Sequence, residues 1–134
     1  MNPLEAGALK PGARPRTLAL IGLGNVAEPH LLAYQTLPDV KVIAAVEPRA
    51  ERRLDVCARY ALRGFATTEA MLEECRPDIA CILTPAATHR TLTQLCAAAG
   101  SHIMCEKPMA ITLEDAFAMA QSCASANVQF FYGS

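Results

Sequence analysis

The sequence predicts a single α/β domain built on a doubly wound parallel sheet. Three observations predict this class: short strand-like runs alternate with amphipathic helical segments, the runs are apolar on both faces, and the connections between elements are short. Strands that are apolar on both faces are typical of a parallel sheet covered by helices on each side. Right-handed crossovers then place helices on both faces of the sheet.

Apolar runs supply the expected strands. They cover residues 17–22, 41–46, 79–83 and 102–105, and a last strand-like run at 128–132 lies near the end of the chain. Each run is shorter than an ordinary helix, and apolar residues dominate it. Both properties favour strands that are buried in a sheet.

Three segments between the runs show a helical spacing of apolar residues. In each segment, apolar side chains recur at i, i+3, i+4 and i+7, which predicts a helix that buries one stripe against the sheet. The stripes are Leu54, Cys57, Ala58 and Ala61; Leu92, Leu95, Cys96 and Ala99; and Ala116, Met119, Ala120 and Cys123. Thr112 and Asp115 resemble a capping box that opens the last helix, and Gly100 marks the expected end of the helix before it.

Composition and charge exclude several classes of protein. The 134 residues are 52% apolar and 19% charged, and 12 Lys and Arg against 13 Asp and Glu give a net charge of −1. The basic residues are scattered, which argues against nucleic-acid binding. No run reaches the roughly 20 apolar residues that cross a bilayer. Residues 1–16 lack the apolar segment of a signal peptide and are expected to form a flexible arm. We therefore expect a cytoplasmic protein with no nucleic-acid or membrane partner.

The cysteines are expected to be reduced thiols. None of them forms a C-x-x-C pair, and no cluster of Cys and His has the spacing of a zinc site. Most fall on positions that the helix and strand patterns assign to the interior, where a thiol behaves as a small apolar group. The sequence thus predicts neither disulfides nor a metal site. The residues are Cys57, Cys75, Cys81, Cys96, Cys105 and Cys123.

The first expected strand runs into a glycine-rich segment of the form G-x-G-x-x-[GA], which reads Gly22-Leu23-Gly24-Asn25-Val26-Ala27. In such a loop Gly22 permits the tight turn, Gly24 lets a diphosphate approach the backbone, and Ala27 lets the next helix lie close to the sheet. N–H groups at the start of that helix then face the phosphates, which assigns Asn25 and Val26 to the same site. A plain structural turn is the alternative for this motif taken alone.

Three residues after the loop are expected to be structural. Glu28 suits the positive end of the helix dipole, and Pro29 is tolerable because the helix has barely begun. We expect His30 to be a packing or capping histidine rather than a ligand.

An acidic residue at the end of the second expected strand favours a dinucleotide site. Glu47 lies 20 positions after Ala27, the spacing of a carboxylate that accepts hydrogen bonds from the adenosine ribose. This carboxylate would repel a 2′-phosphate, so NAD is the predicted cofactor. Arg49 would soften that preference by pairing with the phosphate, which keeps NADP as an alternative. A solvated strand end is the alternative interpretation of Glu47.

A second charged segment, Cys105-Glu106-Lys107-Pro108, follows the expected strand at 102–105. Ligands of open α/β sheets bind beyond the carboxyl ends of the strands, so this turn is expected to face the nicotinamide end of the cofactor. The Lys107 ammonium would orient a substrate hydroxyl or carbonyl there and stabilise negative charge as hydride is transferred. Taken without other evidence, Lys107 is equally well explained as a surface lysine.

Taken in order, the motifs resemble the N-terminal domain of the Gfo/Idh/MocA family, which is named after glucose–fructose oxidoreductase and inositol dehydrogenase. The resemblance runs from residue 17 to the C-terminus and implies a Rossmann-type NAD(P)-binding domain over 17–134. The segments that carry it are Leu20-Ile21-Gly22-Leu23-Gly24, His30, Ala45-Val46-Glu47, Thr84-Pro85, His89, Glu106-Lys107-Pro108 and Thr112-Leu113-Glu114-Asp115.

The resemblance also implies residue roles. Thr84 and Pro85 would form a loop that lines the cofactor, with His89 near the start of the next helix. Glu106 and Lys107 would form the family's E-K-P turn, with Lys107 the catalytic lysine that bridges nicotinamide and substrate. For His89, an exposed helix residue is the alternative.

The resemblance implies an NAD(P)-dependent oxidoreductase module that transfers hydride between nicotinamide and a hydroxyl-bearing carbon of a sugar, cyclitol or similar polyol. Members of this family continue into a second domain that forms the substrate pocket, and we expect that domain to be absent from this chain. Two alternatives are a non-catalytic dinucleotide-binding or regulatory module and a Rossmann domain for another nucleotide-bearing ligand. An uncovered apolar face at Val128, Phe130 and Phe131 predicts a homo-oligomer.

Overall fold

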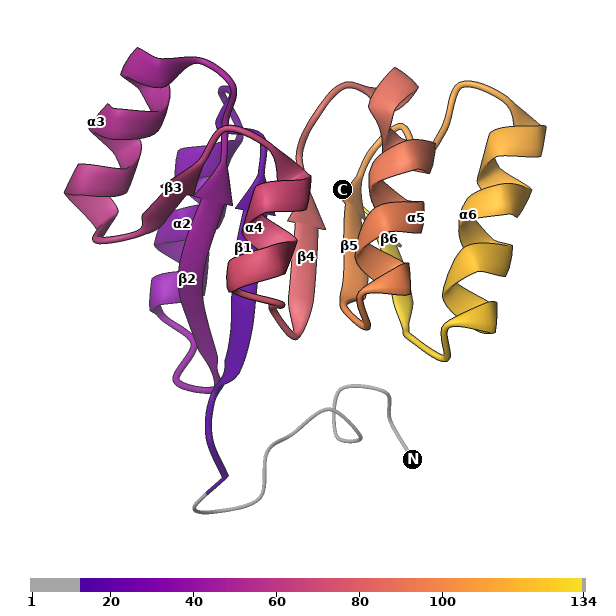
Figure 1. The fold of residues 1–134 in the computed structure, drawn as a ribbon, viewed down its shortest axis with the longest axis horizontal. Coiled ribbons are helices and arrows are strands. Elements are labelled where there is room, and N and C mark those ends of the chain that lie inside the picture. The colour runs from indigo at the N-terminus through magenta and orange to yellow at the C-terminus, as the bar shows by residue number, and fades with distance from the viewer. Residues whose placement is uncertain (1–12, 134) are drawn as a thin grey trace.

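Strands and helices alternate along the chain in the computed structural model, which describes residues 13–133 (Figure 1). The order of elements is β1 (Arg16–Ile21), α2 (Ala27–Gln35), β2 (Val40–Val46), α3 (Ala50–Tyr60), β3 (Arg63–Phe65), α4 (Thr68–Glu74), β4 (Ile79–Ile82), the 3₁₀ turn η1 (Ala86–Thr88), α5 (His89–Ala98), β5 (His102–Glu106), α6 (Leu113–Ser125) and β6 (Phe130–Gly133).

The six strands form one sheet in the order β3-β2-β1-β4-β5-β6, and every neighbouring pair is parallel. The order reverses between β1 and β4, and at such a switch point the loops leave a crevice beyond the carboxyl ends of the strands. The predicted Rossmann-type fold is therefore confirmed. The crevice is the place in this fold where a ligand site is expected.

Helices cover both faces of the sheet, as predicted. In Figure 1 helices α4, α5 and α6 lie in front of the sheet and α2 lies behind it. Alternate residues of β1 serve the two layers: Ala19 and Ile21 join one buried cluster with α4, α5 and α6, whereas Leu18 and Leu20 join the other with α2 and α3. This double burial explains why the strand sequences are apolar without alternation.

Strand β3 and helix α4 were not predicted from the sequence. β3 has three residues, two of them exposed, and α4 has seven, so neither is long enough to show a clear period. The Thr67 side chain accepts a hydrogen bond from the Ala70 N–H and caps α4. A threonine at this position is an ordinary helix start, and it is the one local feature that indicates this helix.

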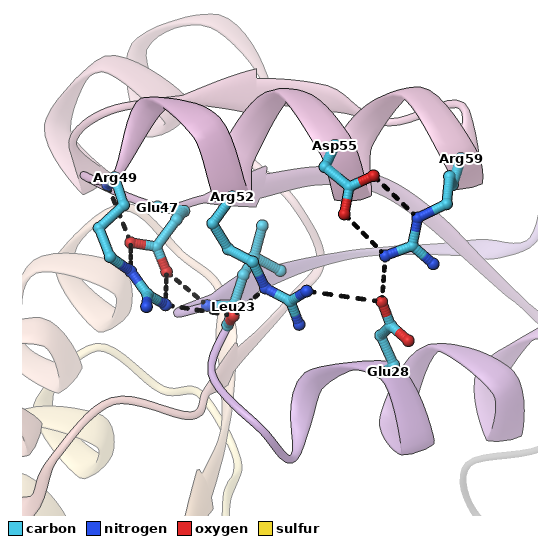
Figure 2. Close-up of polar contacts among 7 residues, drawn as sticks. All are labelled: Leu23, Glu28, Glu47, Arg49, Arg52, Asp55 and Arg59. Carbon is cyan, nitrogen blue, oxygen red and sulfur yellow. Dashed lines mark hydrogen bonds and ion pairs between the residues drawn. The ribbon is translucent and has the colours of Figure 1, made fainter.

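The predicted helix stripe holds on α5, fails at the exposed Ala120 of α6, and fails at most of its positions on α3. Cys96 in α5 and both Met119 and Cys123 in α6 are buried as predicted. In α3, however, Leu54 is 68% exposed, and Val56 occupies the core in its place. The predicted stripe on α3 is therefore wrong at Leu54, Ala58 and Ala61, which are exposed. Helix α3 instead buries Val56 and Cys57 and directs Arg52 to the Leu23 carbonyl of the glycine loop (Figure 2).

The helix ends agree with the sequence. Thr112 caps α6 and accepts a hydrogen bond from the Asp115 N–H at 3.0 Å. The Asp115 side chain pairs with Arg90 of α5 instead of completing a capping box. Gly100 follows the end of α5 with a φ of +90°, a conformation that glycine adopts without strain.

The last strand corrects one prediction about the exposed face. Val128 and Phe130 pack against the buried cluster under α5 and α6, so they do not belong to an uncovered surface. Phe131 is 52% exposed, as predicted, and Tyr132 is exposed to the same extent. The alternation of side chains along a strand places neighbouring residues on opposite faces of the sheet.

Five of the six cysteines are buried, and all six carry free thiols. Burial raises the pKa of Cys96 and of Cys105 to about 12, so these thiols stay protonated and act as packing groups. Among residues 13–133, no helix is both long enough and apolar enough to cross a membrane.

Residues 1–12 of the arm predicted at 1–16 lie outside the described residues. Arg14 is placed, and its guanidinium donates to the Asp78 carboxylate at 2.8 Å and 3.2 Å. β1 begins at Arg16.

Candidate functional site

The loop from β1 to α2 needs a glycine at position 22. The φ of Gly22 is +98°, and a Cβ there would lie 2.9 Å from Thr84 Cγ2 and 3.3 Å from the Leu83 carbonyl carbon. The Gly22 N–H also donates to the Val46 carbonyl at 2.8 Å. The turn is therefore held between the ends of β2 and β4.

Gly24 has the opposite surroundings. A Cβ at Gly24 would meet no protein atom within 4 Å, so this side of the loop faces open space. The space fits the predicted role of Gly24, in which the backbone is left accessible to a diphosphate. The packing of the protein itself does not require a glycine there.

Helix α2 begins directly after the loop, and no side chain caps it. Ala27 is fully buried, and its N–H donates to the Gly24 carbonyl at 3.2 Å. Val26 occupies the N-cap position without a side-chain hydrogen bond; Asn25 and Val26 are exposed. Uncapped N–H groups and the positive end of the helix dipole favour an anion at this point.

Glu47 follows β2 and binds the glycine loop directly (Figure 2). It is 4% exposed. One carboxylate oxygen, Oε1, accepts the Leu23 N–H at 3.1 Å and Arg49 Nη2 at 3.1 Å. The other, Oε2, accepts the Arg49 N–H at 3.0 Å and Arg49 Nε at 3.1 Å. The structure thus excludes the solvated strand end considered for Glu47.

The Arg49 hydrogen bonds decide the charge of this carboxyl. Burial by itself would raise the pKa of Glu47, but the hydrogen bonds from the Arg49 side chain and from the Arg49 and Leu23 N–H groups together lower it. Glu47 is therefore ionised at neutral pH. The Arg49 side chain is 65% exposed, so it faces solvent while it binds Glu47.

Arg52 is a site residue that the sequence analysis missed. Its Nε donates to the Leu23 carbonyl at 2.8 Å, and Arg49 Nη2 approaches the same oxygen at 3.4 Å. Leu23 is thus held by Glu47 through its N–H and by arginines of the α3 start through its carbonyl. The Arg52–Arg53 pair is visible in the sequence, but nothing there indicates its target.

Glu28 is structural, as predicted. Its carboxylate pairs with Arg59 and lies 3.7 Å from Arg52, and Asp55 shares the Arg59 guanidinium (Figure 2). These ion pairs hold the negative charge of Glu28 against α3, away from the open side of Gly24.

Two hollows border the glycine loop. One has a volume of about 460 Å³ and lies beyond β2 and β4; Gly22, Pro48 and Thr84 line it, together with Thr67 and Thr88. The other has a volume of about 570 Å³ and lies beside α2, β5 and β6. Its lining includes Asn25, Val26, His30, Glu106 and Phe131. The loop therefore adjoins a separate cavity on each side.

Thr84, Pro85 and His89 lie in the connection from β4 to α5. Thr84 borders the 460 Å³ hollow, and its hydroxyl accepts a hydrogen bond from the Thr88 hydroxyl at 2.6 Å. Pro85 immediately precedes η1, at its N-cap position. These positions fit the predicted cofactor-lining loop.

His89 is 1% exposed, so the exposed helix residue considered for it is excluded. Its Nε2 lies 2.6 Å from the Thr84 carbonyl oxygen, and its Nδ1 lies 3.0 Å from the Met109 carbonyl oxygen and 3.2 Å from Cys105 Sγ. The ring thus ties the loop after β4 to the segment after β5 from inside the protein. It therefore contacts the predicted cofactor-lining loop at the Thr84 carbonyl, and its part in cofactor binding stays a prediction.

The E-K-P turn begins at the carboxyl end of β5. Glu106 is the last residue of that strand and lines the 570 Å³ hollow. Lys107 and Pro108 are exposed, and the peptide bond between them is cis. His30 Nε2 lies 3.1 Å from Glu106 Oε2, a contact that the sequence analysis did not foresee.

The predicted residues thus form two groups at the carboxyl ends of the strands. The glycine loop, Glu47 and Arg49 meet in a shared hydrogen-bond network. Asn25, Val26 and Glu106 meet around the 570 Å³ hollow. Lys107 adjoins the second group through Glu106.

A family model described as an oxidoreductase family with an NAD-binding Rossmann fold, GFO_IDH_MocA, matches residues 16–134. D-apiose dehydrogenase of Paraburkholderia graminis is 35% identical over 111 residues, which are 82% of this chain and 30% of the relative. D-glucoside 3-dehydrogenase of Escherichia coli is 32% identical over 110 residues, 81% of this chain and 31% of the relative. The chain therefore spans about a third of the length of these relatives.

Solved structures of similar proteins share the fold. The WlbA dehydrogenase of Chromobacterium violaceum, in complex with NADH and UDP-GlcNAcA, superimposes with a TM-score of 0.87 and 30% identity. The match covers 91% of this chain and 36% of that one. The WlbA dehydrogenase of Bordetella pertussis, also with NADH and UDP-GlcNAcA, gives a TM-score of 0.86 at 27% identity, over 90% of this chain and 35% of that one.

Proposed function

This chain belongs to the Gfo/Idh/MocA oxidoreductase family and has its NAD-binding Rossmann fold, and from this premise we propose that it is the cofactor-binding module of a sugar or polyol dehydrogenase. The bound nicotinamide supplies or accepts the hydride. The protein binds and orients the dinucleotide, and Lys107 assists at the substrate oxygen.

The observation that carries this proposal is the position of the glycine loop between two hollows. A dinucleotide has two nucleosides joined by a diphosphate, and it needs an anion site with a cavity on each side. Gly22 borders the 460 Å³ hollow, and Asn25 and Val26 border the 570 Å³ hollow. The uncapped start of α2 provides the anion site between them.

Glu47 is suited to bind the ribose next to the 460 Å³ hollow. Its ionised carboxylate is fixed against Leu23 by a backbone hydrogen bond, so it accepts hydroxyl hydrogen bonds at a defined position. The same charge repels a 2′-phosphate, which favours NAD over NADP. Arg49 counters that preference, because its exposed guanidinium carries the opposite charge beside the carboxylate.

Lys107 is proposed as the catalytic residue. It directly follows Glu106, which lines the 570 Å³ hollow, where the nicotinamide end would lie. An ammonium there hydrogen-bonds a substrate hydroxyl or carbonyl and stabilises the oxygen charge that develops during hydride transfer. The relatives are named as dehydrogenases of apiose and of glucosides, so we propose a sugar, cyclitol or similar polyol as substrate, in a pocket that a second domain completes.

The test is a titration of the chain with NADH and with NADPH, followed by nicotinamide fluorescence. We expect saturable binding of both, with NADH the tighter ligand. Lys107→Ala should leave the affinity nearly unchanged, as should Lys41→Ala, a matched control on β2. No saturable signal for either dinucleotide would contradict the proposal, and a collapse of binding in Lys107→Ala would place that lysine in the phosphate or ribose site.

A non-catalytic binding module is the second candidate. The observation that favours it is the exposed apolar group at Met104, Phe131 and Tyr132 beside the 570 Å³ hollow, a surface typical of an interface. Assays with a panel of polyols separate the two functions: turnover by this chain supports the enzyme, whereas NADH binding without turnover supports the module. We propose that the chain forms a homo-oligomer through this face. Size-exclusion chromatography with light scattering measures its molar mass, and the mass of a single chain would contradict the oligomer.

A further inference from the structure

One side chain joins the two groups of site residues. His30 lies on the first turns of α2, just after the glycine loop, and its imidazole contacts Glu106 at the start of the E-K-P turn. We infer that His30 is a positioning residue that couples the diphosphate loop to Lys107. The inference rests on the proposed function, because it assigns a consequence to cofactor binding at that loop.

Both ring nitrogens of His30 are engaged. Nε2 lies 3.1 Å from Glu106 Oε2, and Nδ1 lies 3.2 Å from the Tyr34 hydroxyl. Tyr34 is buried one helical turn further along α2, and its hydroxyl lies 3.1 Å from Met104 Sδ and 3.3 Å from Cys81 Sγ. The imidazole is thus fixed at both ends, which sets its direction toward Glu106.

The network accepts a neutral or a charged imidazole. A neutral ring donates from Nε2 to Glu106, and its Nδ1 accepts the Tyr34 hydroxyl proton. A protonated ring donates at both nitrogens, and the Tyr34 hydroxyl then donates to Met104 Sδ. In both states Glu106 receives a hydrogen bond. The contact is therefore retained whichever form His30 adopts.

The backbone transmits this contact to both sites. The His30 N–H donates to the Val26 carbonyl at 3.3 Å, so the imidazole is carried by the turn of α2 that borders the glycine loop. Glu106 is the last residue of β5 and precedes Lys107 directly. A ligand that fixes the start of α2 consequently fixes Glu106 and restrains Lys107.

A histidine that serves only to pack the core would be expected away from the cavity. The side chains of His30 and Glu106 instead remain 28% and 23% exposed and both line the 570 Å³ hollow. Their contact spans 76 sequence positions. The contact therefore joins α2, which follows the glycine loop, to the end of β5, which precedes Lys107, in the lining of this hollow.

The chain allows a direct test, because it has only three lysines: Lys10, Lys41 and Lys107. Acetylation by a limiting amine reagent, read residue by residue by mass spectrometry, reports the accessibility of Lys107 against Lys41 in the same molecule. In the unmodified sequence we expect saturating NADH to slow the labelling of Lys107 by about threefold or more. The labelling of Lys41 should not change.

The variants separate positioning from folding. We expect His30→Ala still to bind NADH, as titration measures, but to lose the protection of Lys107 at saturating NADH. His30→Gln, whose amide replaces the Nε2 donor, should retain it. Glu106→Ala combined with His30→Ala should add nothing to His30→Ala alone, as expected for two partners of one contact. His102→Ala, at the opposite end of β5, is the matched control. NADH should slow the labelling of Lys107 in this variant as it does in the unmodified sequence.

Two results would overturn the inference. In the first, NADH protects Lys107 in His30→Ala as well as it does in the unmodified sequence. In the second, the unmodified sequence binds NADH but its Lys107 labelling does not change. In either case the dinucleotide site would stand. Failure of the unmodified sequence to bind NADH at all would instead overturn the proposed function, and the inference with it. Circular dichroism of each variant establishes that it is folded, and Glu106→Ala replaces His30→Ala if the latter does not fold.

Discussion

Glu47 and Glu106 each stand at the carboxyl end of a parallel strand, yet their surroundings differ. Glu47 is buried and receives four hydrogen bonds, from the Leu23 N–H and from the backbone and guanidinium of Arg49. Glu106 borders an open hollow, and the contact that reaches it from α2 is His30. The end of the site proposed for the ribose is therefore preformed around one carboxylate, whereas the lysine end is held by separate contacts of His30 with Glu106 and of His89 with the Met109 carbonyl.

This difference suits the two tasks that the proposed function assigns to the domain. The adenosine part of the cofactor does not react, so rigid binding of it serves affinity. The nicotinamide end must admit a substrate and leave room for hydride transfer, so an open hollow is required there.

Gly22→Ala should damage the preformed end most severely. The positive φ and the contact of a Cβ with Thr84 and Leu83 should destabilise the fold by about 1–3 kcal/mol and abolish NADH binding. Gly24→Ala is the matched control: its Cβ meets no protein atom, so urea unfolding should be nearly unchanged while NADH binding is weakened. If Gly22→Ala and the unmodified sequence had the same free energy of unfolding, the turn would not be rigid.

Glu47→Gln should weaken NADH binding by about tenfold and reduce stability by about 1–3 kcal/mol, because charge-assisted hydrogen bonds from Arg49 and Leu23 are lost. Titration and urea unfolding measure the two effects. Glu51→Gln, an exposed carboxylate in the first turn of α3, is the control. Unchanged NADH affinity in Glu47→Gln would remove this carboxylate from the ribose site.

Arg49→Ala should move the affinities for the two dinucleotides in opposite directions. Its guanidinium now occupies acceptor positions of Glu47, so its loss should leave NADH binding equal or slightly tighter. NADPH binding should weaken by about tenfold, because a charge-assisted contact to the 2′-phosphate is lost. Arg63→Ala, an exposed arginine of β3 paired with Glu74, should change neither. A parallel loss of both affinities would contradict this role.

The smallest effect concerns pH. The folded pKa of Glu47 lies below its usual value, so the stabilisation by its charge is complete above the unfolded pKa of about 4.3. It is lost as the pH falls through the lower folded value. The difference in unfolding free energy between the unmodified sequence and Glu47→Gln should therefore be constant from pH 7 to 5 and shrink below pH 4. A difference that already declines at pH 6 would mean that Glu47 is not held by Arg49.

Prediction from the sequence succeeded where the chain itself imposes a pattern. Apolar runs and helical spacing gave the parallel sheet and helices α3, α5 and α6, and the glycine motif gave the start of α2. The spacing from Ala27 to Glu47 placed a carboxylate beside the glycine loop, where it binds Leu23. It failed for β3 and α4, which are too short to show a period, and for the side of the sheet that Val128 and Phe130 occupy.

The side-chain partners of the site could not be predicted, because they depend on how elements pack. Arg52 reaches Leu23 across 29 positions, and His89 clamps the loop after β4 from inside the protein. Nothing in the local sequence distinguishes these residues from a surface arginine or an exposed histidine.

The sequence by itself determined the fold class, the glycine turn and the acidic residue twenty positions beyond it, because periodicity and backbone strain are local properties of the chain. Only the tertiary structure decided that Arg49 fills the acceptor positions of Glu47 and that His30 meets Glu106. Those contacts exist because the packing of the elements lets side chains of α2 reach β5 and lets side chains of α3 reach the glycine loop. The sequence order alone does not specify these distances.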